Sequence, residues 1–171
     1  MIDISTLGAG ITIISLTSFP MGFQLSCFAD DTDSLVIEQT EVSGFEKLYD
    51  GTIFGYDKTS PVLLAVSVIP NSEDDINLKI LLQKRKSNSN YIALLDTITM
   101  VVSYGDGGRV VLSGGVILSG SLADSMQSAG RKKSNTYNFA FGSFDGFQSK
   151  KQAMGNLAGA AVNIGRNLLG I

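Results

Sequence analysis

The stretch DGTIFGYDKTSPVLLAVSVIP, residues 50–70, begins as a turn and ends in a nearly continuous apolar run. Asp50-Gly51 indicates the turn, because glycine readily adopts positive φ. In the run 61–69 both alternating sets of side chains are mainly apolar, as in a strand covered on both faces. We therefore expect the turn and hairpin arm of a β-sheet, followed by a buried strand.

Most of the remaining chain reads as short strands separated by turns. In NTYNFAF (135–141) aromatic and smaller residues alternate with a period of two. ITMVVSY (98–104) and RVVLSGGVILSG (109–120) follow the same pattern, with a bulge or bend expected at Gly114-Gly115. YGDGGR between them predicts a hairpin loop. Further strands are expected in residues 10–17, 23–28, 34–42 and 52–56.

NSEDDINLKILLQKRKSN breaks this pattern and predicts an α-helix near residues 72–86. Ser72 can cap it, acidic residues fill its first turn, and basic residues fill its last, which suits the helix dipole. We expect Ile76, Ile80 and Leu81 to face the core, with Leu78 and Leu82 widening that stripe.

The composition allows a core and removes several kinds of chemistry. Of 171 residues, 44% are hydrophobic and 17% charged, which fits one domain or one domain with a short appendage. Histidine is absent, so Ser-His and Cys-His pairs and histidine metal ligands are excluded. The single cysteine, Cys27, rules out an internal disulfide and a cysteine zinc cluster, and we expect a buried thiol.

Candidate ligand sites have simpler alternatives. The basic clusters at 84–86 and 131–133 are either a solvated helix end and loop or contacts for nucleic acid or another partner. DDTDS (30–34) lacks the later glycine and glutamate of a calcium loop. No phosphate loop occurs, and no carboxylate pair is marked as an acid and a base. We expect no catalytic residue, cofactor or metal, and an enzyme with a carboxylate-only site is the weakest hypothesis.

Both ends of the chain are apolar. The start has Asp3 and no basic residue before its apolar part, so we expect no secretory signal and an intracellular product. After Phe147 the chain becomes small and apolar, which predicts a helical extension over 148–171. Its polar residues argue against a membrane span. Its apolar stripe needs a surface to cover it, and we expect it to dock on a partner through Leu157, Ile164 and Leu168; the alternative is that it folds back on its own domain.

The order of these signals over residues 10–145 resembles the tail tube proteins of contractile-tailed bacteriophages. FQLSCFADDTDSLVIEQTEV (23–42) resembles an early strand, its turn and the next strand of that family. Residues 50–82 are similar to its turn, strand, bend, apolar strand and helix, and the segments 101–120 and 135–142 to its final sheet. The apolar N-terminal stretch and the extension after Phe147 depart from the family. These departures raise the possibility of a specialised tube-like protein at the baseplate end.

The resemblance implies a mainly β domain over residues 1–147, with two packed antiparallel sheets in a sandwich or barrel and one flanking helix. It implies homohexameric, stacked rings that contact tail tube, sheath or baseplate proteins, in a virion assembled in the host cytoplasm. DNA would pass through the lumen without specific binding, and the net charge of −3 suits such a conduit. The alternative function is a nucleic-acid-binding module that uses the two basic clusters. In the tube interpretation, the arm segment 51–61 joins subunits through Thr52, Ile53, Phe54, Tyr56 and Lys58.

Overall fold

The described chain forms nine strands and one helix. The computed structural model describes residues 8–87, 96–128 and 130–147. Its elements are β1 (Gly10–Ser15), β2 (Phe19–Leu25), β3 (Leu35–Ile37), β4 (Ser43–Lys47), β5 (Ile53–Asp57), β6 (Val62–Val68), α1 (Glu73–Ser87), β7 (Ile98–Ser103), β8 (Arg109–Ser119) and β9 (Asn135–Phe147). The prediction of a mainly β protein with a flanking helix is confirmed, whereas the extension at 148–171 lies outside the described residues.

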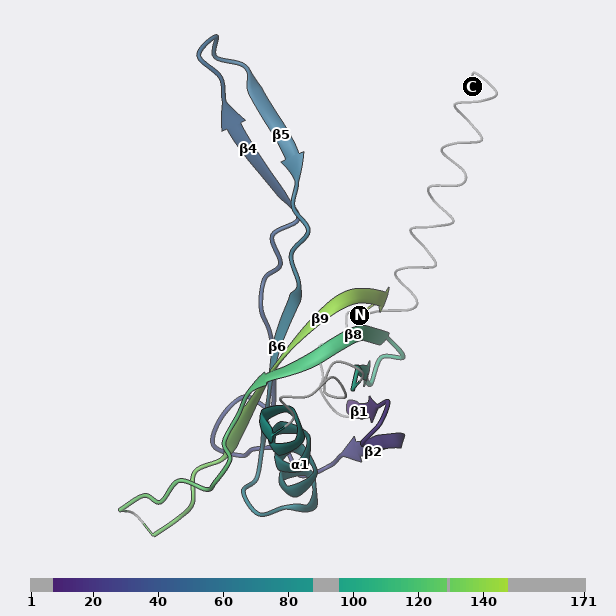
Figure 1. Ribbon diagram of the computed structural model, residues 1–171, viewed down its shortest axis with the longest axis vertical. Coiled ribbons are helices and arrows are strands. Elements are labelled where there is room, and N and C mark those ends of the chain that lie inside the picture. Colours follow the sequence, from purple (N-terminus) through teal and green to yellow (C-terminus); the bar gives the residue numbers. More distant parts are fainter. Residues whose placement is uncertain (1–7, 88–95, 129, 148–171) are drawn as a thin grey trace.

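Seven strands form one curled sheet in the order β2-β1-β7-β8-β9-β6-β3 (Figure 1). Every neighbouring pair in this order is antiparallel. The other two strands, β4 and β5, pair with each other and project away from the curled sheet (Figure 1). This differs from the expected pair of packed sheets. Both edges of β6 are occupied, by β3 and β9, so the preceding strand β5 finds its partner only in β4.

The core lies on the inner face of the curled sheet. Tyr137, Phe139 and Phe141 of β9 are fully buried, as their alternation predicted. The alternate residues of β7, Ile98, Met100 and Val102, are buried with them. Other strands and the helix complete this cluster with Ile11, Ile13, Leu25, Leu64, Val66, Val68, Leu78, Leu81, Leu82, Val110, Leu112 and Ile117.

The bulge expected in the long strand β8 is confirmed. Pairing with β7 shifts between Ile98↔Gly115 and Met100↔Leu112, and Gly114 has a φ of 64°. Gly115 allows the Phe141 ring to approach closely, because an added Cβ would lie 2.3 Å from that ring. The hairpin loop before β8 is also as expected, with Tyr104 N donating to the Gly108 carbonyl at 2.9 Å.

The helix α1 forms where predicted, but it presents a different face to the core. Ser72 caps it by accepting a 3.2 Å hydrogen bond from Asp75 N. Leu78, Leu81 and Leu82 are buried, so the prediction that Ile76 and Ile80 point inward is wrong; both are exposed. The rotation has a physical cause: Asp74 and Asp75 share the buried face and find hydrogen-bond partners there.

Asp74 ties the start of α1 to the end of β2. Its Oδ2 accepts 2.7 Å hydrogen bonds from the backbone N–H groups of Ser26 and Cys27. The expected strand over 23–28 therefore ends at Leu25, apart from a single bridge between Phe28 and Val68. Cys27 is half-buried in this connection, not fully buried as expected.

Candidate functional site

The most distinctive feature is the hairpin arm, which we define as residues 38–61 between β3 and β6. The β3–β6 ladder continues to a 2.9 Å bond from Glu38 N to the Leu63 carbonyl, and the hairpin begins with a 2.9 Å bond from Lys58 N to the Val42 carbonyl. The sequence alone had suggested one strand over 34–42. The structure divides this region into β3 and the root of the hairpin arm.

Local polar contacts shape the tip of the hairpin arm. The Leu48 carbonyl accepts a 3.0 Å hydrogen bond from Gly51 N, and Gly51 has a φ of 86°. Asp50 Oδ1 accepts from Thr52 N at 2.9 Å and from Thr52 Oγ1 at 2.6 Å. Aspartate commonly closes such turns, so the Asp50-Gly51 prediction of a turn is confirmed.

The register of the hairpin arm sorts its side chains into two faces. Phe45 pairs with Gly55, and Lys47 with Ile53, so Phe45 and Ile53 share one face. Phe54 and Tyr56 share the other face, where the Tyr56 ring covers Gly44. Ile53, Phe54 and Tyr56 are 70%, 58% and 41% exposed, and Phe45 is 75% exposed. Neither face is covered by the rest of the described chain.

The structure thus places the arm residues named from the sequence in one element. Thr52 is at the turn, and Ile53, Phe54 and Tyr56 are on β5. Lys58 forms an exposed 2.6 Å ion pair with Glu41 at the base of the hairpin. Sequence reasoning missed the opposite strand and its apolar side chains. The apolar residues of that strand and its flanking turn can be seen in the sequence, and all four are exposed in the structure: Val42, Phe45, Leu48 and Tyr49.

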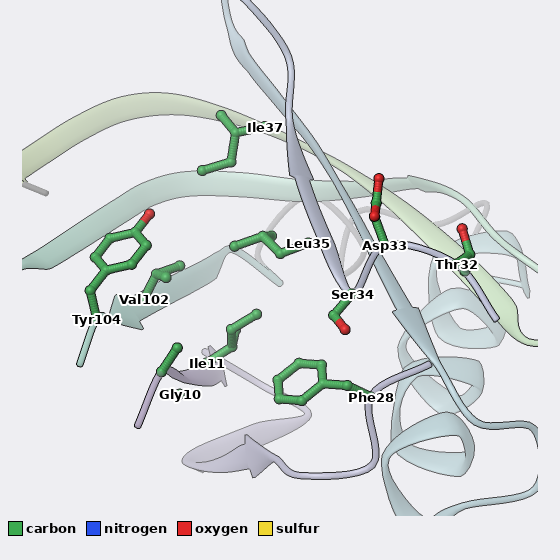
Figure 2. Close-up of a pocket in the computed structure, with 11 residues that line it drawn as sticks. Gly10, Ile11, Phe28, Thr32, Asp33, Ser34, Leu35, Ile37, Val102 and Tyr104 are labelled. Atoms are coloured by element: carbon green, nitrogen blue, oxygen red, sulfur yellow. The ribbon is translucent and has the colours of Figure 1, made fainter. Parts of the chain in front are cut away.

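A cavity of about 580 Å³ lies where the curled sheet brings β3 near β1 and β7. Figure 2 shows Ile11, Phe28, Leu35 and Val102 around a common space, with polar residues of the 32–34 segment at one side. The strand order is open, so β2 and β3 are the edges of the sheet. Edge strands expose unpaired backbone groups and are ready to pair with another chain.

The basic clusters differ in their surroundings. Arg131 pairs with Asp30, and Lys132 pairs with Asp124 at 2.7 Å, so the loop cluster is largely neutralised by its own chain. Lys84 and Lys86 at the end of α1 are exposed. Asp30, the partner of Arg131, belongs to the segment 30–34, whose sequence only partly resembles a calcium loop. Its neighbour Asp31 accepts a 3.4 Å hydrogen bond from Ser134 N.

The described residues contain no group of three or more His, Cys, Asp or Glu side chains arranged to hold a metal ion. Within the same part of the chain, no helix has the length and apolar character needed to cross a membrane. The predicted docking residues Leu157, Ile164 and Leu168 lie outside the described residues.

The fold is similar to that of chains in solved contractile injection systems. It is similar to a chain of the anti-feeding prophage (AFP) baseplate, with a TM-score of 0.55, 9% identity, and coverage of 88% of this chain and 99% of that one. A chain of the AFP tube-terminating cap gives a TM-score of 0.52 at 9% identity, covering 86% and 92%. A chain of the PVC sheath/tube terminator, from an extracellular contractile injection system in the extended state, gives 0.47 at 9% identity, covering 86% and 96%.

The sequence itself identifies a family. Residues 2–145 match the family model described as tail fiber protein gp32, and the chain belongs to that family. No curated protein matches the sequence. The expected relationship to tail proteins is confirmed by this membership.

Proposed function

We propose that this chain is a structural virion protein that forms homohexameric rings at the tube or baseplate-proximal end of a contractile phage tail. Stacked rings would form a conduit through which DNA passes during ejection without specific binding. In this proposal the chain has no enzymatic role. Its partners are other copies of itself and neighbouring tube, sheath or baseplate proteins. Residues 148–171 would form a separate extension that docks on such a partner.

The observation that carries the proposal is the hairpin arm with apolar side chains on both faces. A two-stranded hairpin is only marginally stable alone in water. Aromatic side chains that remain exposed on such a hairpin gain stability when a partner covers them. Burial of a large apolar side chain contributes roughly 1.5–3 kcal/mol, so four such residues could anchor a stable contact.

Two further features support assembly into a ring. Within the part of the chain that the structure describes, the curled sheet ends in two unpaired edges, β2 and β3, and pairing between copies would satisfy their backbone groups. Pro20 on β2 is typical of an edge strand. The net charge of −3 favours passage of DNA over retention, since a basic lumen would bind phosphates by releasing their counterions.

The test is a double variant of the hairpin arm, Phe54→Ser with Tyr56→Ser, compared with the unaltered chain. Light scattering at rising concentration and negative-stain imaging would measure assembly, and circular dichroism would measure folding. We expect a folded monomer that no longer forms rings. The matched control is Leu16→Ser with Met126→Ser, which removes two exposed apolar side chains elsewhere. Rings formed by the Phe54/Tyr56 variant would overturn the role of the arm, and an unaltered chain that stays monomeric would overturn the ring.

A further inference from the structure

The excess negative charge of the protein is concentrated in the hairpin arm. Residues 38–61 contain five carboxylates and two lysines, a net charge of −3, which equals the net charge of the whole chain. The rest of the chain therefore carries as many basic as acidic residues. A surface that receives the arm should combine apolar side chains with positive charge.

Such a surface exists at the C-terminal end of α1. A groove of about 400 Å³ lies between the last turns of the helix and the end of β8. Its apolar lining includes Leu82, Leu118 and Leu122, and its basic lining includes Arg85 and Lys86. Leu118 and Leu122 are partly exposed, so an occupant would find apolar contacts there. Within the described chain, Lys84 and Lys86 take part in no ion pair, and their charge is available to a partner.

The tip of the hairpin arm has matching chemistry. Leu48 and Tyr49 are exposed at the turn, and Tyr49 is fully open to solvent. Glu46 lies on the strand just before them, on the same face as Phe54. The tip thus offers an aromatic ring and an aliphatic side chain close to a carboxylate.

We propose that the tip of the hairpin arm of one copy docks in the α1–β8 groove of a second copy. Tyr49 and Leu48 fill the apolar lining beside Leu118 and Leu122, and Glu46 faces Lys86. In Figure 1 the tip and α1 lie toward opposite ends of the molecule, so the tip does not reach the groove of its own chain. The contact is head-to-tail, and a head-to-tail contact closes into a ring or continues as a filament, according to its rotation.

This inference rests on the proposed self-assembly and specifies which two surfaces meet. A cysteine pair tests the contact directly: Tyr49→Cys with Leu122→Cys in a chain that also carries Cys27→Ser. Mild oxidation of the assembled protein should give a ladder of disulfide-linked multimers on a denaturing gel. Each single-cysteine variant serves as a control and should give dimers at most. Assembled protein that gives no ladder would overturn the proposed contact.

Charge reversal provides an independent test. Glu46→Lys and Lys86→Glu should each raise the concentration needed for assembly by about tenfold or more, because like charges then meet. The two changes combined should restore most of the original assembly. The control is Lys133→Glu, an exposed residue outside the groove, which should assemble normally.

The outcomes separate this inference from the proposed function. If the unaltered chain forms rings, yet neither the ladder nor the charge effect is seen, the groove is not the receptor and the ring proposal stands. If the unaltered chain does not self-associate at high concentration, both proposals fail. If the arm docks instead on a sheath or baseplate protein, homotypic assembly should be indifferent to Lys86→Glu, which also contradicts the inference.

Discussion

The Tyr137 hydroxyl donates a 2.7 Å hydrogen bond to Asp75, joining strand β9 to the first turn of α1. The Asp75 side chain is fully buried and also pairs with Lys79 at 2.7 Å. It accepts further 2.9 Å bonds from Asn135 Nδ2 and Asn71 N. Burial favours the neutral acid, but the hydrogen bonds from Lys79, Tyr137 and Asn135 outweigh it and lower the Asp75 pKa. Burial and the neighbouring carboxylate together raise the pKa of Tyr137.

We expect Asp75→Asn to destabilise the protein by about 2–3 kcal/mol, because it removes the charged acceptor of several buried hydrogen bonds. Tyr137→Phe should cost about 1–2 kcal/mol, since it removes one donor to that carboxylate. Urea denaturation followed by circular dichroism would measure both losses. Glu73→Gln, an exposed carboxylate in the same helical turn, is the control and should cost less than about 1 kcal/mol. Equal losses for Asp75→Asn and Glu73→Gln would show that only the helix dipole matters.

Asp96 should make stability depend on pH in the acid range. It accepts hydrogen bonds from Ser15 Oγ, from Ser18 Oγ at 2.6 Å and from Thr17 N at 3.1 Å, which link the β1–β2 turn to the start of β7. Burial raises its pKa, but these hydrogen bonds outweigh burial and lower the pKa to about 2 from 3.8.

A carboxylate whose pKa is lowered by folding contributes stability above its unfolded pKa and loses it as the pH falls through the folded value. We therefore expect Asp96→Asn to cost about 1–2 kcal/mol at neutral pH, allowing for partial solvent screening. The cost should shrink between about pH 4 and pH 2, as the native carboxylate becomes protonated. Denaturation at a series of pH values would measure it, and a difference between the two proteins that is independent of pH would contradict this role for Asp96.

Close packing at the β8 bulge predicts a sharp contrast between two glycines. Gly115→Ala would place a methyl group 2.3 Å from the Phe141 ring and 3.0 Å from the Ile98 carbonyl oxygen. We expect a loss of about 1–3 kcal/mol from overpacking. Gly142→Ala is the matched control on β9, because its nearest contact would be an ordinary 3.8 Å to the Gly114 carbonyl oxygen. Thermal unfolding would compare them, and similar melting temperatures would contradict the packing at Gly115.

The extension at residues 148–171 can be tested by truncation after Phe147. Its apolar stripe is too short to hold a stable helix alone in water, so docking on a partner should order it. We expect the truncated chain to be soluble and folded but to enter particles poorly. Solubility, circular dichroism and incorporation into particles would be measured separately. An insoluble or unfolded product would show that these residues complete the core of their own domain.

The sequence by itself determined the local elements. The alternation of apolar side chains in 135–141 and 98–104 predicted two buried strands, and the glycines at 114–115 predicted the bulge. These features could be predicted because each depends on residues that are neighbours in the sequence. Ser72 and the acidic turn after it likewise marked the start of α1.

Only the tertiary structure decided which surfaces these elements present. Ile76 and Ile80 have the spacing of a core stripe, yet α1 turns them outward because Asp74 and Asp75 find partners far away in the sequence, at Ser26 and Tyr137. The sequence leaves the basic cluster 131–133 as a solvated loop or a partner contact, whereas the fold pairs Arg131 with Asp30, about a hundred residues earlier in the chain. The exposure of both faces of the hairpin arm was decided in the same way. Its strands β4 and β5 pair only with each other and project away from the seven-stranded sheet, so the rest of the described chain covers neither face.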